Sequence, residues 1–184
     1  MSRYKATLYP ITPVFLRFAP APRAYTLVSL NATDVPAMTA LQIRTGPDQV
    51  VPRDAEFYRA HFSGGQTAIG FVDANATLIA HALIRINEDV TTMLNVLVDP
   101  NHRGQQLHTQ MIRHWLDTAK ESGITTASAR IRTGNTVSLK NFDAAGMMIC
   151  ATEPSPEDAS AMTHVMKKSL QETTVRNVDF RPSL

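Results

Sequence analysis

Apolar and polar residues alternate over several short stretches of this chain, a pattern typical of strands that bury one face. The stretches cover residues 24–30, 66–73, 78–86, 90–98, 125–131, 147–151 and 161–170. Short turns join the second, third and fourth stretches, which indicates an antiparallel meander. The pattern therefore predicts a central sheet of about six to seven strands.

Two helices are expected before the meander, because apolar residues recur there at spacings of three and four. We expect the first to be capped by Thr33 or Asp34. Its apolar positions are Val35, Met38, Leu41 and Ile43. Pro52 is suited to open the second helix, and the glycines after residue 63 stop it.

Two more helices are expected after the meander. A long one begins at Gln105 and stops at Gly123, and a shorter one covers residues 135–145 and stops at Gly146. The apolar face of the long helix consists of Leu107, Met111, Ile112, Trp115, Leu116 and Ala119. Strands and helices therefore intermix along the chain, which predicts an α/β (α+β) fold with about four helices around the sheet.

The length of 184 residues fits one domain with a sizeable core. We expect that domain over residues 24–170, with a proline-rich extension over residues 1–23 and a polar tail over residues 171–184. Hydrophobic residues make up 43% and charged residues 18%, which excludes a disordered chain. The formal net charge of +2 is too small to indicate a nucleic-acid partner.

Cys150 is the only cysteine, so no disulfide and no cysteine-based zinc site forms within one chain, and we expect no metal. No apolar run reaches the roughly 18 residues of a membrane span. Prolines interrupt the only N-terminal stretch that resembles the apolar region of a signal peptide. These features predict a cytoplasmic protein without a membrane partner.

The junction between the strand at 90–98 and the long helix is the first candidate for chemistry. A helix N-terminus offers unpaired N–H groups and a positive dipole end, which suit a phosphate or pyrophosphate. Arg103 adds a fixed positive charge there, and Gly104 allows close approach to the main chain. An ordinary strand-to-helix turn with a surface arginine explains the same residues equally well.

Asn135, Ser138 and Phe142 form the second candidate, because spacings of three and four place them on one helical face. An amide, a hydroxyl and an aromatic ring there would line one side of an extended ligand. A helix packed on a sheet accounts for the same spacing, with Asn135 as a cap and Phe142 in the core.

Taken together, the two segments resemble the GNAT superfamily of acyl-CoA-dependent N-acyltransferases. That family carries Arg/Gln-x-x-Gly-x-Gly/Ala before its third helix, and residues 103–108 read Arg-Gly-Gln-Gln-Leu-His. The family's later segment is Asn-x-x-Ala/Ser-x-x-x-Tyr-x-x-x-Gly-Phe, and residues 135–147 read Asn-Thr-Val-Ser-Leu-Lys-Asn-Phe-Asp-Ala-Ala-Gly-Met. This chain departs at Gln106 and His108, which add bulk beside the expected pyrophosphate, and at Phe142, where the family often has tyrosine.

The resemblance implies a mixed, mostly antiparallel sheet and acetyl-CoA as co-substrate. The pantetheine would pair with the backbone of one strand. The residues expected to bind the cofactor are Val96, Leu97, Val98, Arg103, Gly104, Gln105, Gln106, Leu107, His108, Asn135, Ser138 and Phe142. A primary amine of a small molecule or protein would then attack the thioester directly in a ternary complex.

The residues expected to take part in catalysis are Asn95, Glu88, Ser138 and Tyr58. Asn95 would orient the substrate or merely cap a bulge. Ser138, Tyr58 or water would replace the missing tyrosine as proton donor. The proton acceptors considered are Glu56, His61, Glu88 and His164. The residues considered for an anionic acceptor are Arg44, Arg53, Arg130 and Arg132.

A non-catalytic acyl-CoA-binding or regulatory module is the alternative, in which the altered loop and Phe142 reflect lost chemistry. Phosphate-binding and hydrolase classes are disfavoured because their glycine-rich and Gly-x-Ser-x-Gly motifs are missing from the sequence. Exposed strand edges make a homodimer an expected assembly.

Overall fold

The computed structural model describes residues 24–45 and 51–171. The extension expected over residues 1–23 and nearly all of the expected tail lie outside the described residues. The elements in chain order are β1 (Thr26–Leu30), η1 (Ala32–Asp34), α1 (Val35–Thr45), α2 (Ala55–Ser63), β2 (Thr67–Val72), β3 (Leu78–Asn87), β4 (Val90–Val98), η2 (Pro100–His102), α3 (Leu107–Glu121), β5 (Thr126–Arg132), α4 (Thr136–Ala144), β6 (Met148–Ser155) and β7 (Asp158–Ser169). In the described part of the chain, no helix is both long and apolar enough to span a membrane.

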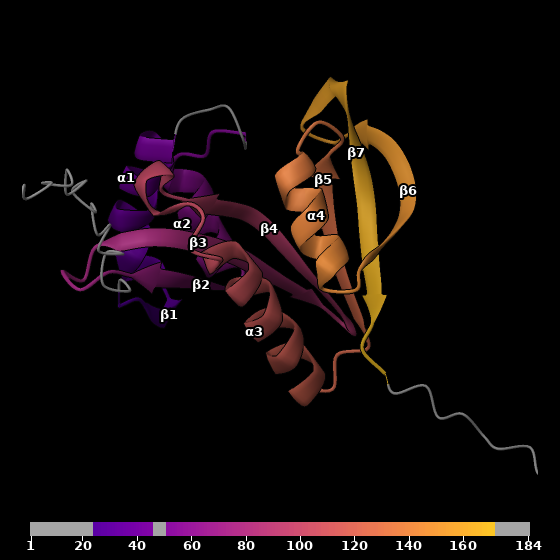
Figure 1. Cartoon of the computed structure of the whole chain (residues 1–184), viewed down its shortest axis with the longest axis horizontal. Coiled ribbons are helices and arrows are strands. Elements are labelled where there is room, and N and C mark those ends of the chain that lie inside the picture. Colours follow the sequence, from indigo (N-terminus) through magenta and orange to yellow (C-terminus); the bar gives the residue numbers. More distant parts are fainter. Residues whose placement is uncertain (1–23, 46–50, 172–184) are drawn as a thin grey trace, which may run out of the picture.

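The strands of this part of the chain form one seven-stranded sheet in the order β1-β2-β3-β4-β5-β7-β6. Every neighbouring pair is antiparallel except β4 and β5, which are parallel. Figure 1 shows that the sheet opens between these two strands, with β1–β4 on one side and β5, β7 and β6 on the other. The predicted α/β fold with a mostly antiparallel sheet is confirmed.

Two apolar clusters cover opposite faces of the sheet because successive strand residues point in opposite directions. On β3, Ala82 and Ile84 join α3 and Phe142 of α4, whereas Leu83 packs with α1 and Tyr58 of α2. One face of the sheet is therefore covered by α1 and α2, and the opposite face by α3 and α4 (Figure 1).

The starts of the first two helices differ from the prediction. Asn31, rather than Thr33 or Asp34, is the cap, and its side chain and that of Asp34 form a reciprocal capping box across η1. The second helix begins after Asp54, whose side chain accepts the Phe57 N–H at 2.8 Å, so Pro52 lies outside it.

Ile43 was expected on the apolar face of α1, but its exposed fraction is 76%. The buried residues of this helix are Val35, Met38, Leu41, Gln42 and Thr45. With 3.6 residues per turn these positions share one stripe, and position 43 points away from it. The last two strands also extend further than predicted, because β6 and β7 pair almost up to their shared turn.

Candidate active site

The sheet opens at a bulge in β4 centred on Asn95. This residue has a left-handed backbone with φ +47°, and the register between β3 and β4 shifts at that point. β5 pairs with β4 only from Val90 to Met93 and then diverges. The backbone of Asn95 to Val98 therefore has no strand partner on the β5 side, although β3 still pairs on the other.

A buried polar cluster holds the bulge in place. The side-chain oxygen of Asn95 lies 3.0 Å from the Tyr58 hydroxyl and 3.0 Å from His81 Nε2, and both groups donate to it. The Tyr58 hydroxyl also lies 3.2 Å from the side-chain oxygen of Gln42. Burial raises the pKa of Tyr58 and lowers the pKa of His81 to about 4, so both are neutral at pH 7. The cluster is therefore an uncharged support for the strand.

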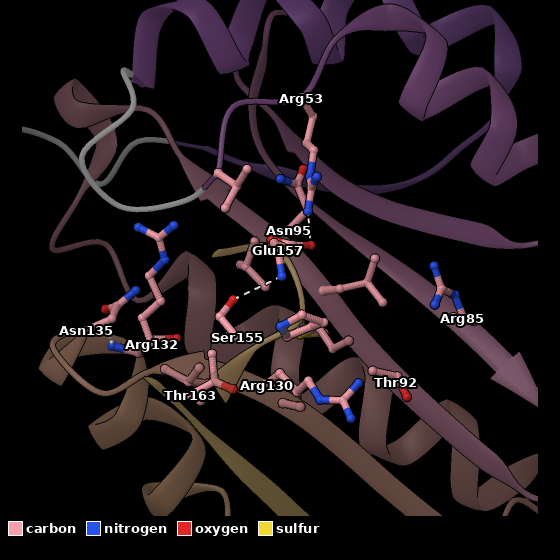
Figure 2. A pocket seen from close by; sticks show the side chains of 18 of the residues that line it. Arg53, Arg85, Thr92, Asn95, Arg130, Arg132, Asn135, Ser155, Glu157 and Thr163 are labelled. Atoms are coloured by element: carbon pink, nitrogen blue, oxygen red, sulfur yellow. Dashed lines mark hydrogen bonds and ion pairs between the residues drawn. The ribbon is translucent and has the colours of Figure 1, made fainter. Parts of the chain in front are cut away.

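A pocket of about 380 Å³ lies where β4 and β5 separate (Figure 2). It gathers several residues from the two sequence candidates, which are Asn95, Val96, Asn135, Ser138 and Phe142. Three arginines that the sequence suggested for an anionic acceptor, Arg53, Arg130 and Arg132, also line it. Arg44 lies elsewhere and forms an ion pair with Asp99 at 2.9 Å.

The other sequence candidates for proton transfer do not line this pocket. Glu88 is exposed in the turn between β3 and β4, and Tyr58 is fully buried behind Asn95. His61 Nε2 lies 2.7 Å from the Thr67 carbonyl oxygen, and burial lowers the pKa of this histidine. His164 bonds to Thr152 at 2.8 Å on the β6–β7 hairpin, and Glu56 is exposed in the first turn of α2.

Glu157 is the functional candidate that the sequence reasoning missed. Among the described residues that line the pocket, Glu157 alone carries a carboxylate. It comes from the turn between β6 and β7 and forms an ion pair with Arg53, which precedes α2 (Figure 2). The local signal was the Pro-Ser-Pro-Glu-Asp turn at residues 154–158, but nothing in it indicates a partner 104 positions away.

The loop before α3 presents unused backbone donors. Gly104 and Gln106 both have left-handed backbones, with φ +75° and +58°. The N–H groups of residues 104–109 bond to no acceptor within the described residues, and no side chain caps α3. Arg103 is exposed beside them, with its Nε 3.4 Å from the Val98 carbonyl oxygen. This geometry suits an anion held by backbone amides and one guanidinium.

The backbone at Gln106 explains why the GNAT motif has glycine at that position. A left-handed residue with a side chain costs about 1 kcal/mol relative to glycine. We expect Gln106→Gly to raise the free energy of unfolding by about 0.5–1 kcal/mol in urea denaturation, part of the relief being offset by the extra freedom of glycine in the unfolded chain. The neighbouring Gln105→Gly, at a residue without positive φ, should lower it instead. Equal changes in the two variants would contradict the strain at position 106.

His108 is directed at α4 rather than along the loop. Its Nδ1 accepts from the Asn141 amide at 3.0 Å, and its ring stands edge-on to Phe142 with 5.4 Å between centroids. Nε2 is buried with no partner, and desolvation lowers the pKa of His108 to about 4. The neutral ring joins α3 to α4, so its bulk packs against Phe142.

Asn135 and Phe142 have structural roles in addition to lining the pocket. The Asn135 side chain accepts the Ser138 N–H at 3.1 Å and so caps α4. Phe142 is 2% exposed and belongs to the core between α3, α4 and the sheet. The interpretation of Asn135 as a helix cap and of Phe142 as a core residue is therefore confirmed. Both residues also line the pocket.

Comparison with known proteins gives the class of protein that this fold and site define. The family model described as Acetyltransferase (GNAT) family matches residues 35–147. The chain belongs to the GNAT family, and it is an acyltransferase as the two sequence motifs predicted.

The chain is 24% identical over 122 residues to the Escherichia coli K12 ribosomal protein bS18-alanine N-acetyltransferase, a match that covers 66% of this chain and 79% of the relative. The crystal structure of the ribosomal-protein-S18-alanine N-acetyltransferase from Escherichia coli superposes with a TM-score of 0.72 and 18% identity, over 83% of this chain and 98% of that one. A phosphinothricin acetyltransferase from Sinorhizobium meliloti in complex with acetyl-CoA superposes with a TM-score of 0.68 and 16% identity, over 82% and 90%. At these identities the superpositions establish the shared fold.

Proposed function

We propose that this protein transfers an acetyl group from acetyl-CoA to a primary amine of a small molecule or protein in a ternary complex. The observation that carries the proposal is that two backbone surfaces both lack partners. One is the edge of β4 after Met93 that faces β5, and the other is the set of N–H groups in the loop before α3. A cofactor with an amide-bearing arm and a pyrophosphate matches both surfaces at once.

The cofactor-binding residues follow from these surfaces. Val96, Leu97 and Val98 would bind the pantetheine through backbone groups. Residues 103–108 would hold the pyrophosphate through the free N–H groups and the Arg103 guanidinium. Asn135, Ser138 and Phe142 would close the other side from α4.

The chemistry requires one bond to form and one to break. The neutral amine nitrogen attacks the thioester carbonyl carbon, an N–C bond forms, the C–S bond breaks, and the thiolate leaves. A backbone N–H of β4 next to the bulge would stabilise the charge that develops on the carbonyl oxygen. Asn95 would act as a positioning residue, since its side chain is committed to Tyr58 and His81.

Two proton transfers complete the reaction. We assign Glu157 as the acceptor of the amine proton, because it supplies the carboxylate of the pocket wall. The thiolate takes up a proton from Ser138 or water, and a thiol is acidic enough to leave without a strong acid beside it. Tyr58 is separated from the pocket by Asn95 and stays protonated because burial raises its pKa.

Melting of the purified protein with acetyl-CoA, ATP and NAD in parallel tests the cofactor, followed by a free-thiol assay over a panel of amines. We expect a selective rise in melting temperature with acetyl-CoA and thiol release with at least one amine. Binding without turnover of any amine would favour the non-catalytic acyl-CoA-binding module. A response to ATP or NAD instead would contradict the proposal.

Arg103→Glu tests the phosphate loop. Reversing the charge beside the free N–H groups should weaken acetyl-CoA binding about 10-fold or more, because the new carboxylate repels the pyrophosphate. Isothermal titration calorimetry measures this dissociation constant directly. The control is Arg59→Glu, an exposed residue of α2 on the other side of the sheet. Equal affinity of the Arg103 variant and the wild type would remove the loop from the site.

A further inference from the structure

We infer that the acetyl acceptor is a small amine that carries a separate anionic group, a carboxylate or phosphonate, bound by Arg85. The inference rests on the proposed function and narrows its substrate class. It comes from the charge of the pocket wall and from the order of the groups along β4.

The wall of the pocket carries one guanidinium that no carboxylate of the described residues compensates. Four arginines line it, which are Arg53, Arg85, Arg130 and Arg132, against the single carboxylate of Glu157. Arg53 pairs with Glu157, Arg130 with Glu153 at 3.0 Å, and Arg132 with Asp158 at 3.9 Å. Arg85 pairs with no carboxylate of the described residues. An unpaired guanidinium in a pocket favours an anionic ligand.

Arg85 lies in a row of cross-strand neighbours on the face of the sheet that α1 and α2 cover. It is opposite Thr92 of β4, Thr92 is opposite Ser128 of β5, and Ser128 is opposite Lys167 of β7. Arg130 is two residues beyond Ser128 on the same face of β5, because side chains alternate along a strand. Figure 2 shows Arg85 at the right of the pocket, with Thr92 and Arg130 below it. The row offers the Thr92 hydroxyl and the unpaired Arg85 guanidinium to one anion, whereas Arg130 is held by Glu153.

The distance between the two ends of the pocket sets the spacing within the acceptor. Thr92 precedes the bulge residue Asn95 by three positions, on the order of 10 Å along a strand. The acetyl group would be held at the bulge, so the amine belongs at that end and the anion near Thr92. Because the two ends are three strand residues apart, the two groups of the acceptor are separated by several bonds rather than by one carbon.

The cover of the pocket favours a small acceptor. The Arg53–Glu157 ion pair joins the segment before α2 to the β6–β7 turn, and Ser155 and Pro156 of that turn also line the pocket. The volume of about 380 Å³ lies at the lower end of the range of small-molecule pockets, roughly 300–1,000 Å³. An acidic peptide is the competing occupant and is included in the test.

The test uses ω-amino carboxylates from glycine to 6-aminohexanoate, each paired with its neutral carboxamide, together with 3-aminopropylphosphonate and an acidic peptide. We expect the longer carboxylates to exceed their carboxamides about 10-fold or more in kcat/KM, as charge-assisted hydrogen bonds allow. Arg85→Gln should remove that preference, because the carboxylates lose a charge-assisted hydrogen bond and the carboxamides lose only a weaker neutral one. The ratio of phosphonate to carboxylate identifies which anion the site prefers. Arg113→Gln, an exposed arginine of α3 on the other face, is the matched control.

Failure of this inference and failure of the proposed function give different results. Equal turnover of carboxylates and carboxamides, a preference that survives Arg85→Gln, or clear superiority of the peptide would overturn the anionic small-molecule acceptor while leaving an acetyltransferase. In parallel, calorimetry measures binding of 6-aminohexanoate to the protein saturated with CoA. Binding that Arg85→Gln abolishes, without turnover, would support the anion site and contradict the proposed catalysis. Absence of both binding and turnover would overturn the inference.

Discussion

Replacement of Glu157 by glutamine should lower kcat/KM about 100-fold or more near neutral pH, while the affinity for acetyl-CoA stays at the wild-type value. An alkylammonium must lose a proton before its nitrogen attacks, and Glu157 provides the carboxylate of the pocket. Glutamine keeps the size and a carbonyl oxygen for Arg53 but accepts no proton. The loss should therefore appear in the rate rather than in the cofactor complex.

The pH profile separates a proton acceptor from a structural partner of Arg53. At high pH the free amine is already neutral, so the deficit of Glu157→Gln should shrink as the pH approaches the pKa of the acceptor amine. Arg53→Gln breaks the same ion pair from its other end and should raise KM more than it lowers kcat. If the two variants lose activity equally at every pH, Glu157 acts by holding Arg53 and the assignment is wrong. Glu121→Gln, at the exposed end of α3, is the matched control and should leave kcat/KM unchanged.

Much of the fold could be predicted from local pattern, because strand alternation and helical spacing are local properties. The meander of β2, β3 and β4 and the long helix α3 lie within a few residues of their predicted bounds. The predicted starts of the first two helices were wrong, because the capping side chains of Asn31 and Asp54 set them rather than the spacing of apolar residues. Hydrogen bonds of single side chains to backbone N–H groups decide those boundaries.

The candidate site also has parts that the local sequence indicates and parts that only the assembled sheet brings together. The loop at 103–108 and the helix at 135–145 could be proposed from the sequence because the residues of each candidate lie close together along the chain. A bulge at Asn95 was only one of two alternatives, since it depends on the register between β3 and β4 and on Tyr58 and His81 behind it. Arg85 and Glu157 enter the pocket only after the sheet is assembled, and no local pattern marks them.

Acidification from pH 6.5 to pH 4 should lower the free energy of unfolding by up to about 6 kcal/mol, chiefly through His81 and His108. Both histidines are neutral in the folded protein, because burial lowers the pKa of each to about 4. In the unfolded chain they titrate near their ordinary pKa of 6.5, so the unfolded state binds more protons throughout this window. Stability is therefore fully present above pH 6.5 and is lost as the pH falls towards 4.

Other groups with lowered pKa values also reduce stability on acidification, either between pH 6.5 and 4 or mainly at lower pH. Burial also lowers the pKa of His61, which adds to the loss. A backbone hydrogen bond from Thr77 lowers the pKa of Asp73, and a side-chain bond from Ser160 lowers that of Asp158. Lowered carboxyl pKa values cost stability mainly as the pH falls through and below the ordinary value of 3.8, so they contribute little between pH 6.5 and 4.

Urea denaturation at pH 7, 5.5 and 4.5 measures the slope, and two substitutions isolate its source. His81→Gln keeps an N–H for the Asn95 oxygen, and His108→Gln keeps an acceptor for Asn141, but neither side chain titrates. We expect each variant to lose stability at pH 7 from imperfect packing, yet to show a shallower dependence on pH, with the double variant nearly flat. His114→Gln, at an exposed position of α3, should retain the full wild-type slope. A wild-type slope in the double variant would show that the two rings take up protons while folded, and the neutral cluster behind the bulge would have to be abandoned.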